Sequence, residues 1–219
     1  MRQPLQPVQW ALVSGGGYHA TGYEVVPIPP HVHAALKDLV ADHATTSARA
    51  FGGPGEPLED VIIFGRTKRI RMPQQLQHEL REAFRPLVST FCSCALEDGA
   101  TVGGGGIRVY HRGASLAAHL DWAHKFVVSA TLNVKQSSNG SRWPLHMHAF
   151  GAAAPTLLLH EEGQAVLYEG SRLLHSRPHL EDESYAAAFV GFVPRDYPAG
   201  RRWLTRLFVG AVRRSEGGG

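Results

Sequence analysis

Two residue types with metal-ligand chemistry lie two positions apart at the end of the segment Ile107–Asp121, IRVYHRGASLAAHLD. In a β-strand, residues i and i+2 point to the same face. His119 and Asp121 can therefore bind one metal ion from one side. A second histidine, His175, follows in the run YEGSRLLHSRP. Two histidines and one carboxylate, with other positions open, form the facial triad of non-haem Fe(II) sites. The sequence therefore predicts a metal centre, and with it a catalytic centre, at these three residues.

Other histidine pairs compete for this interpretation, because the chain contains 13 histidines and one His-x-Asp pair is weak support by itself. The pair His31 and His33 opens a predicted helix, in which residues i and i+2 do not share a face. The pair His146 and His148 falls in a predicted strand and is a stronger rival. It has no acidic residue nearby, so a surface or substrate-facing role is favoured for it.

The composition is that of a globular chain with a sizeable core. Its 219 residues suit one domain, or one domain with a helical extension, and 43% of them are apolar. The net charge of +3 is small and dispersed, so no nucleic-acid partner is expected. The sequence shows no signal segment and no apolar run long enough for a bilayer. We therefore expect no membrane association and a cytoplasmic location.

The chain has two cysteines, Cys92 and Cys94. A disulfide between residues this close is expected to be strained. Zinc would need further sulfur or histidine ligands at finger spacing, and these are missing. The sequence therefore predicts two reduced, partly buried thiols, which agrees with a reducing compartment.

The first hundred residues are predicted to be a helical support with little strand. Apolar residues at helical spacing indicate one helix from His31 to about Arg49 and another that starts at Pro73. Pro86 is expected to kink or end the second helix. Short strands are predicted at Tyr23–Val26 and, in buried form, at Val61–Phe64.

The character of the chain changes after Gly103–Gly106, which we interpret as a flexible entrance to the first strand of a sheet rather than a phosphate loop. Many short strands at this spacing are typical of a sandwich or barrel, of which the jelly roll is one form. The predicted strands lie near 106–111, 126–134, 143–149, 156–159, 164–168, 171–176 and 185–192.

These elements predict a mainly β, α+β fold in one domain spanning residues 1–219. Its parts are the helical N-terminal region 1–100, a jelly-roll catalytic core at 101–197, and a C-terminal part at 198–219. That last part has basic and apolar residues at helical spacing, which predicts an amphipathic helix packed on its own domain and followed by a disordered tail.

Five further segments, in order and at plausible spacing, accompany Ile107–Asp121 between residues 105 and 195. They read SATLNV from Ser129, WPLHM from Trp143, GQAVLYEG from Gly163, LHSRP from Leu174 and YAAAFVGFVP from Tyr185. With these segments the chain resembles the prolyl-4-hydroxylase-like branch of the Fe(II)/2-oxoglutarate dioxygenases.

The resemblance implies a double-stranded β-helix, a form of jelly roll, with the metal near its open mouth. It implies Fe(II) as cofactor, 2-oxoglutarate and O2 as co-substrates, and ascorbate as a candidate reductant. The implied reaction hydroxylates an unactivated C–H bond of an amino acid, peptide or small natural product, with release of succinate and CO2. The implied partner is this small-molecule or peptide substrate, and the chain is expected to be a monomer or a homodimer.

The distal carboxylate of 2-oxoglutarate needs a cation, and arginine suits bidentate pairing. Many relatives place a Lys or Arg where this chain has Ser184–Ala186, so the usual anchor is missing. Arg177, two residues after His175 on a predicted strand, is the predicted substitute. Tyr110 resembles the family tyrosine that hydrogen-bonds this carboxylate, and Arg108 on the same face is the second candidate cation.

Weaker candidates for lining the pocket are Thr131, Asn133 and Tyr168. The resemblance also gives Asp121 a discriminating role, because related halogenases have a small residue there; its presence favours hydroxylation. Two alternatives stay open. One is a cupin-type metal dioxygenase that does not use 2-oxoglutarate and binds metal through more histidines, such as His146 or His148. The other is a non-catalytic jelly-roll binding module.

Overall fold

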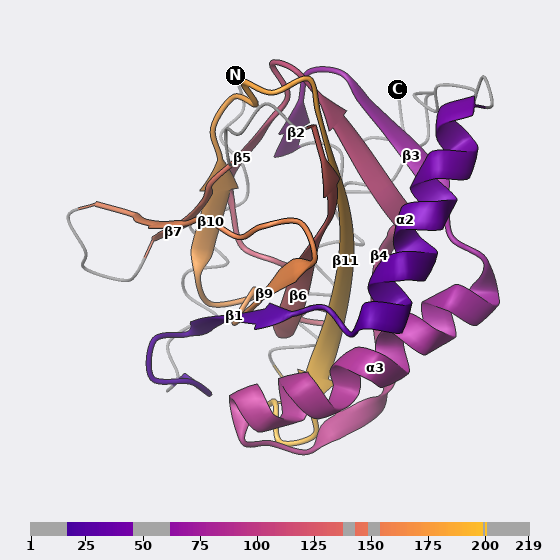
Figure 1. Ribbon diagram of the computed structural model, residues 1–219. Helices are drawn as coiled ribbons and strands as arrows, with labels where there is room; N and C mark the ends of the chain where they lie inside the picture. Colours follow the sequence, from indigo (N-terminus) through magenta and orange to yellow (C-terminus); the bar gives the residue numbers. More distant parts are fainter. Residues whose placement is uncertain (1–16, 46–61, 138–142, 149–153, 199, 201–219) are drawn as a thin grey trace, which may run out of the picture.

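Two antiparallel sheets face each other, and two helices pack on the outside of the larger sheet (Figure 1). The structure is a computed structural model and describes residues 17–45, 62–137, 143–148, 154–198 and 200. Within these residues the fold is the predicted one: mainly β, with a jelly-roll arrangement of strands and flanking helices. The predicted C-terminal helix at 198–219 lies almost entirely outside the described residues.

The larger sheet has six strands, and the smaller sheet has five. In spatial order the larger sheet contains β1 (Tyr23–Pro27), β9 (Gln164–Tyr168), β6 (Val128–Gln136), β11 (Ser184–Pro194), β4 (Leu96–His111) and β3 (Thr67–Arg71). The smaller sheet contains β2 (Ile63–Phe64), β5 (Ser115–His119), β10 (Leu174–Arg177), β7 (Leu145–His148) and β8 (Thr156–Leu158). The candidate functional residues come mainly from β4, β5, β6, β9, β10 and β11.

The helices α2 (Pro30–Thr45) and α3 (Gln74–Cys92) cover the outer face of the larger sheet. Their buried residues recur every three or four positions, as a helix with one apolar face requires. In α3 these residues are Leu76, Leu80, Phe84, Val88, Phe91 and Cys92. On β6 they meet Ala130, Leu132 and Val134. Because side chains alternate along a strand, Ser129, Thr131 and Asn133 face the smaller sheet instead.

Pro86 does not end α3, one of the two outcomes expected at this residue; a kink there stays a prediction. The helix continues to Cys92 with Pro86 inside it, on the exposed face. The buried stripe continues on both sides of this position, through Phe84 and Val88. Packing against the sheet therefore outweighs the one backbone hydrogen bond that proline cannot donate.

The N-terminal hundred residues contribute more strand than expected. β1 and β2 agree with the predicted positions, although Phe64 of β2 is 55% exposed rather than buried. β3 was not predicted, because its sequence TKRIR has only one apolar residue, Ile70. It is an edge strand, and charged side chains on an edge strand oppose pairing with other chains.

The run Gly103–Gly106 is a bulge inside β4 and not a flexible entrance to the sheet, so that interpretation was wrong. Along β11, Ala188 pairs with Ile107 but Val190 pairs with Val102, so extra residues of β4 loop out between them. Gly104 and Gly105 have φ values of 58° and 66°, which favour glycine. The Gly105 carbonyl accepts a hydrogen bond from the backbone N–H of Met72, which leads into α3.

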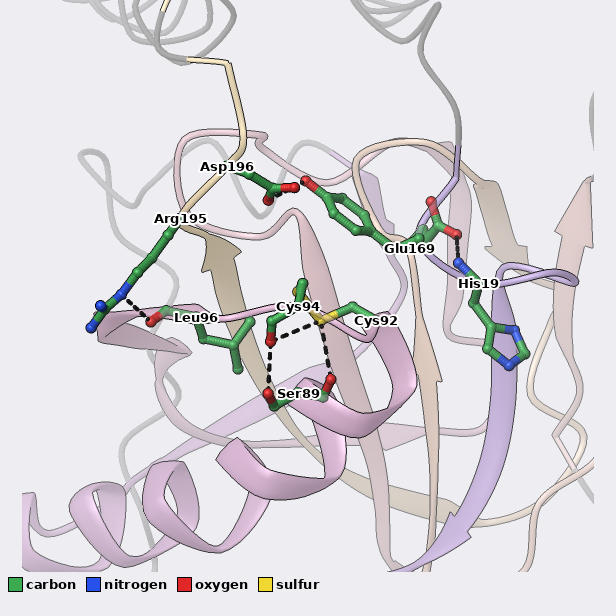
Figure 2. The surroundings of a disulfide bond; sticks show 9 residues. His19, Ser89, Cys92, Cys94, Leu96, Glu169, Arg195 and Asp196 are labelled. Carbon is green, nitrogen blue, oxygen red and sulfur yellow. Dashed lines mark hydrogen bonds between the residues drawn. A yellow bond between two sulfur atoms is a disulfide. The ribbon is translucent and has the colours of Figure 1, made fainter.

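Cys92 and Cys94 form a disulfide, so the prediction of two reduced thiols was wrong (Figure 2). The reason is the conformation of the residue between them. Ser93 ends α3 in the left-handed region, at φ 48°, and brings the two Cα atoms to 5.1 Å, within the range that a disulfide needs. The two cysteines therefore give no support to the expectation of a reducing compartment.

Neither helix of the described residues has the length and apolarity needed to cross a lipid bilayer.

Candidate metal and co-substrate site

The three predicted metal ligands meet where β5 and β10 lie side by side. His119 is the last residue of β5 and pairs directly with His175 of β10. The register between the two strands shifts after this pair, and such bulges often re-aim side chains near functional sites. Asp121 lies two residues beyond the end of β5, in a loop rather than on the strand. The three side chains converge although only the two histidines belong to strands.

The ligand atoms are close enough to share one ion. The Asp121 Oδ1 atom lies 3.6 Å from Nε2 of His175 and 3.9 Å from Nε2 of His119. One ligand atom from each residue lies within 4.8 Å of the others. Among the described residues, no second group of three or more such side chains satisfies this geometry.

Backbone carbonyls fix which imidazole nitrogen faces the centre. The Nδ1 atoms of His119 and His175 lie 2.8 Å from the carbonyl oxygens of Ala117 and Leu173, respectively. A carbonyl only accepts hydrogen bonds, so each neutral ring carries its proton on Nδ1. The lone pair of each Nε2 then points toward the centre, as in metal-binding histidines.

The Asp121 carboxylate is held by a glycine contact. The backbone N–H of Asp121 donates a 2.8 Å hydrogen bond to the Gly170 carbonyl oxygen. A Cβ atom at Gly170 would collide with the Asp121 Oδ2 atom, so only glycine leaves room for this carboxylate. Oδ2 is buried and has no hydrogen-bond partner. A buried, unsatisfied carboxylate oxygen is costly, and a cation would remove that cost.

The protonation states at neutral pH suit metal binding. Burial, followed by the neighbouring His175, lowers the pKa of His119 to about 4. Burial raises the pKa of Asp121, but electrostatic attraction from His175 and His119 outweighs it, so the pKa lies below its usual value. The site thus combines a neutral imidazole with an ionised carboxylate. The residues present therefore fit an Fe(II)-type ion.

The arrangement of strands around this site is shared with solved structures. A prolyl-4-hydroxylase from Pseudomonas putida is 16% identical, with a TM-score of 0.53 over 80% of this chain and 93% of that one. A prolyl hydroxylase from Trichoplax adhaerens, in complex with a hypoxia inducible factor oxygen degradation domain peptide fragment, is 12% identical, with a TM-score of 0.63 over 84% of this chain and 87% of that one. The chain has the double-stranded β-helix fold of these hydroxylases.

HygX from Streptomyces hygroscopicus, solved with nickel and 2-oxoglutarate bound, is 11% identical, with a TM-score of 0.52 over 80% of this chain and 84% of that one. Neither a protein-family model nor a curated protein matches the sequence. At these identities the likeness establishes the fold, and it confirms the fold that the resemblance predicted. The chemistry of the site depends on its own residues.

Arg177, the predicted co-substrate anchor, is a buried cation at 4% exposure. Its guanidinium carbon lies 4.8 Å from the ring centre of Trp143 and 4.9 Å from that of Tyr185. Its Nη1 donates to the Trp143 carbonyl oxygen at 2.6 Å. Within the described part of the chain, no carboxylate lies within ion-pairing distance of Arg177. An unpaired buried charge is costly, so this site is suited to an anion.

Two residues that the sequence did not reveal complete the surroundings of Arg177. The Tyr185 hydroxyl lies 3.4 Å from Arg177 Nη2 and 2.9 Å from Nε2 of His160. Tyr185 is one of the three residues, Ser184–Ala186, at which many relatives are expected to have their cation. The lack of a cation there was the only sign in the sequence that Tyr185 belongs to this site. His160 follows β8 outside any recognisable motif, and its ring is 2% exposed.

The other predicted co-substrate residues occupy different places. Tyr110 is buried on β4 with its ring 4.9 Å from Trp143, in the same cluster as Tyr185. Arg108 is half-buried and donates to the Thr67 hydroxyl of β3 at 3.1 Å, toward the sheet edge. Thr131 is half-buried on the inner face of β6. The Tyr168 hydroxyl reaches the metal site, 3.4 Å from His175 Nε2.

The rival histidines do not join the metal group. On β7, Leu145 and Met147 are buried in the core between the sheets, so the alternating His146 and His148 face outward. His33 hydrogen-bonds the Val134 carbonyl through Nε2 at 3.0 Å, and His31 is exposed. No observation favours the cupin-type alternative, which would need a further histidine among the ligands.

Proposed function

We propose that this protein is an Fe(II)- and 2-oxoglutarate-dependent oxygenase that hydroxylates an unactivated C–H bond. One observation carries the proposal: one ligand of the metal triad, His175, and an unpaired buried cation, Arg177, share one strand. His175 and Arg177 are both on β10, and their side chains point inward because they are two residues apart. A ligand that chelates a metal at one end and carries a carboxylate at the other fits this arrangement.

The metal triad and Arg177 would have separate roles. His119, Asp121 and His175 hold the metal on one side and leave other coordination positions open. Arg177 binds the distal carboxylate of 2-oxoglutarate and so orients the oxoacid end toward the metal. When bound, Fe(II) supplies the oxidative chemistry that couples decarboxylation of 2-oxoglutarate to substrate oxidation.

The surrounding side chains exclude water and hold the ligands in place. The Tyr168 hydroxyl lies 3.4 Å from Nε2 of His175 and close to Asp121, where it helps to hold these two ligands in place. Tyr110 and Thr131 line the space between the sheets, and Arg108 is a second candidate cation nearer the edge. A dry site strengthens the attraction between Arg177 and a carboxylate.

The substrate class is proposed as a peptide or a small molecule. The Trichoplax adhaerens neighbour binds a peptide fragment, which makes a peptide a reasonable first choice. The carboxylate at Asp121 fills the position that a halide would need on the metal, so hydroxylation is favoured over halogenation. A screen of 2-oxoglutarate turnover against amino acids and peptides would identify the class.

The proposal is tested by anaerobic titration of the protein with Fe(II) and 2-oxoglutarate. We expect a charge-transfer absorption band in the visible range, and succinate formation on admission of O2 with a suitable substrate. Asp121→Ala should lose the band, while His146→Ala, which alters an outward-facing histidine, should keep it. A wild-type protein that develops no band, or an Asp121→Ala variant that behaves as wild type, would refute the assignment.

A further inference from the structure

The guanidinium of Arg177 is held in place without being neutralised. An arginine has five N–H groups. One on Nη1 donates to the Trp143 carbonyl oxygen, and Nη2 lies near the Tyr185 hydroxyl and His160 Nε2, at 3.4 and 3.5 Å. The groups that accept from Arg177 are all uncharged: a backbone carbonyl, a phenol and an imidazole. The positive charge therefore stays available to a ligand.

His160 is neutral in this setting. Burial, followed by the charge of Arg177, lowers its pKa to about 3. Arginine can only donate, so the approach of Arg177 Nη2 to 3.5 Å favours a tautomer in which Nε2 accepts and Nδ1 carries the proton. Nε2 can then also accept a hydrogen bond from the Tyr185 hydroxyl, 2.9 Å away. The three side chains form one hydrogen-bonded network, and the Trp143 ring packs against Arg177 and Tyr185.

The property of His160 that affects Arg177 is that it is an uncharged hydrogen-bond acceptor. A carboxylate in its place would also accept hydrogen bonds from Arg177 and Tyr185, but it would form an ion pair and cancel the charge of the guanidinium. A neutral acceptor satisfies the N–H donor while leaving the net charge unchanged. Asn133 supports this residue from β6, because its amide donates to the His160 carbonyl oxygen at 3.2 Å.

We propose that His160 and Tyr185 are positioning residues for the distal carboxylate of the co-substrate, and that His160 orients Arg177 while preserving its charge. This inference rests on the proposed function. In this network Tyr185, one of the three residues where relatives place the cation on β11, contacts Arg177, which extends from β10. Selectivity for a dicarboxylic oxoacid follows from that network.

The test compares two variants that differ only in charge, His160→Gln and His160→Glu. Calorimetric titration of the Mn(II)-loaded protein measures the affinity for 2-oxoglutarate and for oxalate, which chelates the metal but has no distal carboxylate. We expect His160→Gln to bind 2-oxoglutarate within about threefold of wild type, and His160→Glu to bind it at least about tenfold more weakly. Neither substitution should change the affinity for oxalate.

Different outcomes overturn different statements. A wild-type protein that binds Mn(II) but not 2-oxoglutarate would overturn the proposed function. If wild type binds 2-oxoglutarate and His160→Glu binds it equally well, only the present inference fails. An equal loss in His160→Gln and His160→Glu would also overturn it, because charge would then play no part.

A second variant keeps the test valid if His160→Glu does not fold. Tyr185→Phe removes the hydroxyl that joins His160 to Arg177 and should weaken 2-oxoglutarate binding about three- to tenfold without affecting oxalate. Unchanged affinity would contradict the network. His33→Gln is the control, because His33 is a half-buried histidine of α2, on the outer side of the larger sheet, whose Nε2 lies 3.0 Å from the Val134 carbonyl oxygen. It should bind both ligands as wild type does.

Discussion

At the scale of single residues, the least obvious member of the metal site is Gly170. Its backbone carbonyl accepts from Asp121, and its missing side chain provides the space for Oδ2. The glycine does not have a positive φ, so its role is spatial rather than conformational. It acts on the metal only through the position of the carboxylate.

Gly170→Ala should therefore displace Asp121 and weaken metal binding by about 10- to 100-fold, the range typical of residues that orient metal ligands. Calorimetric titration with Mn(II) measures the change. Gly99→Ala is the control, because a Cβ there meets nothing within 4 Å. Wild-type Mn(II) affinity in Gly170→Ala would show that Asp121 tolerates displacement.

The residues that sequence alone could predict are those whose types and spacing carry the chemistry. His119, Asp121 and His175 were predicted as ligands, and the structure brings them together. His160 and Gly170 were not, since neither a buried imidazole nor a glycine next to a carboxylate has a signature along the chain. Their roles depend on contacts across strands, which local sequence does not encode.

At the scale of elements, α3 shows tertiary packing overriding local preference. Pro86 lies inside the helix on its exposed face, while the residues around it are buried against the sheet. The helix therefore forms despite a residue that costs about 3 kcal/mol relative to alanine in a helix interior.

Pro86→Ala should recover part of that cost and raise the free energy of unfolding by about 1–3 kcal/mol. Urea denaturation followed by circular dichroism measures it, with metal-binding affinity as the control for an unchanged site. A variant less stable than wild type would mean that the helix is adapted to proline at this position.

Strand positions were predictable where apolar residues dominate and less so elsewhere. β9 was predicted at its observed bounds, because its residues are nearly all buried. A strand ending near His119 was assumed for the metal pair, although SLAAH of β5 has no clear alternation of its own because its residues are small. β3 was missed, because charged residues obscure its alternation. The bulge in β4 also resists prediction, because a glycine run is equally compatible with a loop.

At the scale of the whole molecule, two buried histidines link stability to pH. The pKa of His160 falls to about 3 and that of His119 to about 4, against 6.5 for an exposed histidine. Between these limits the unfolded chain binds protons that the folded chain does not. The free energy of unfolding must therefore fall as the pH falls below 6.5.

For metal-free protein we expect each histidine to contribute a slope of up to about 1.4 kcal/mol per pH unit between pH 6 and pH 4. His160→Gln cannot be protonated and should have a shallower profile than wild type. Urea denaturation at a series of pH values measures both slopes. Parallel profiles would mean that His160 is protonated in the folded protein as readily as in the unfolded one.

The position of Arg177 on β10 has one more consequence. When two separate elements supply the two ends of a binding site, the distance between the ends depends on how those elements pack. Here a single strand provides both a metal ligand and the anchor, so their separation is set by two residues of strand rise, about 6.6 Å. Strand β10 therefore fixes the length of co-substrate that the site accepts, and residues on other elements can vary with the substrate.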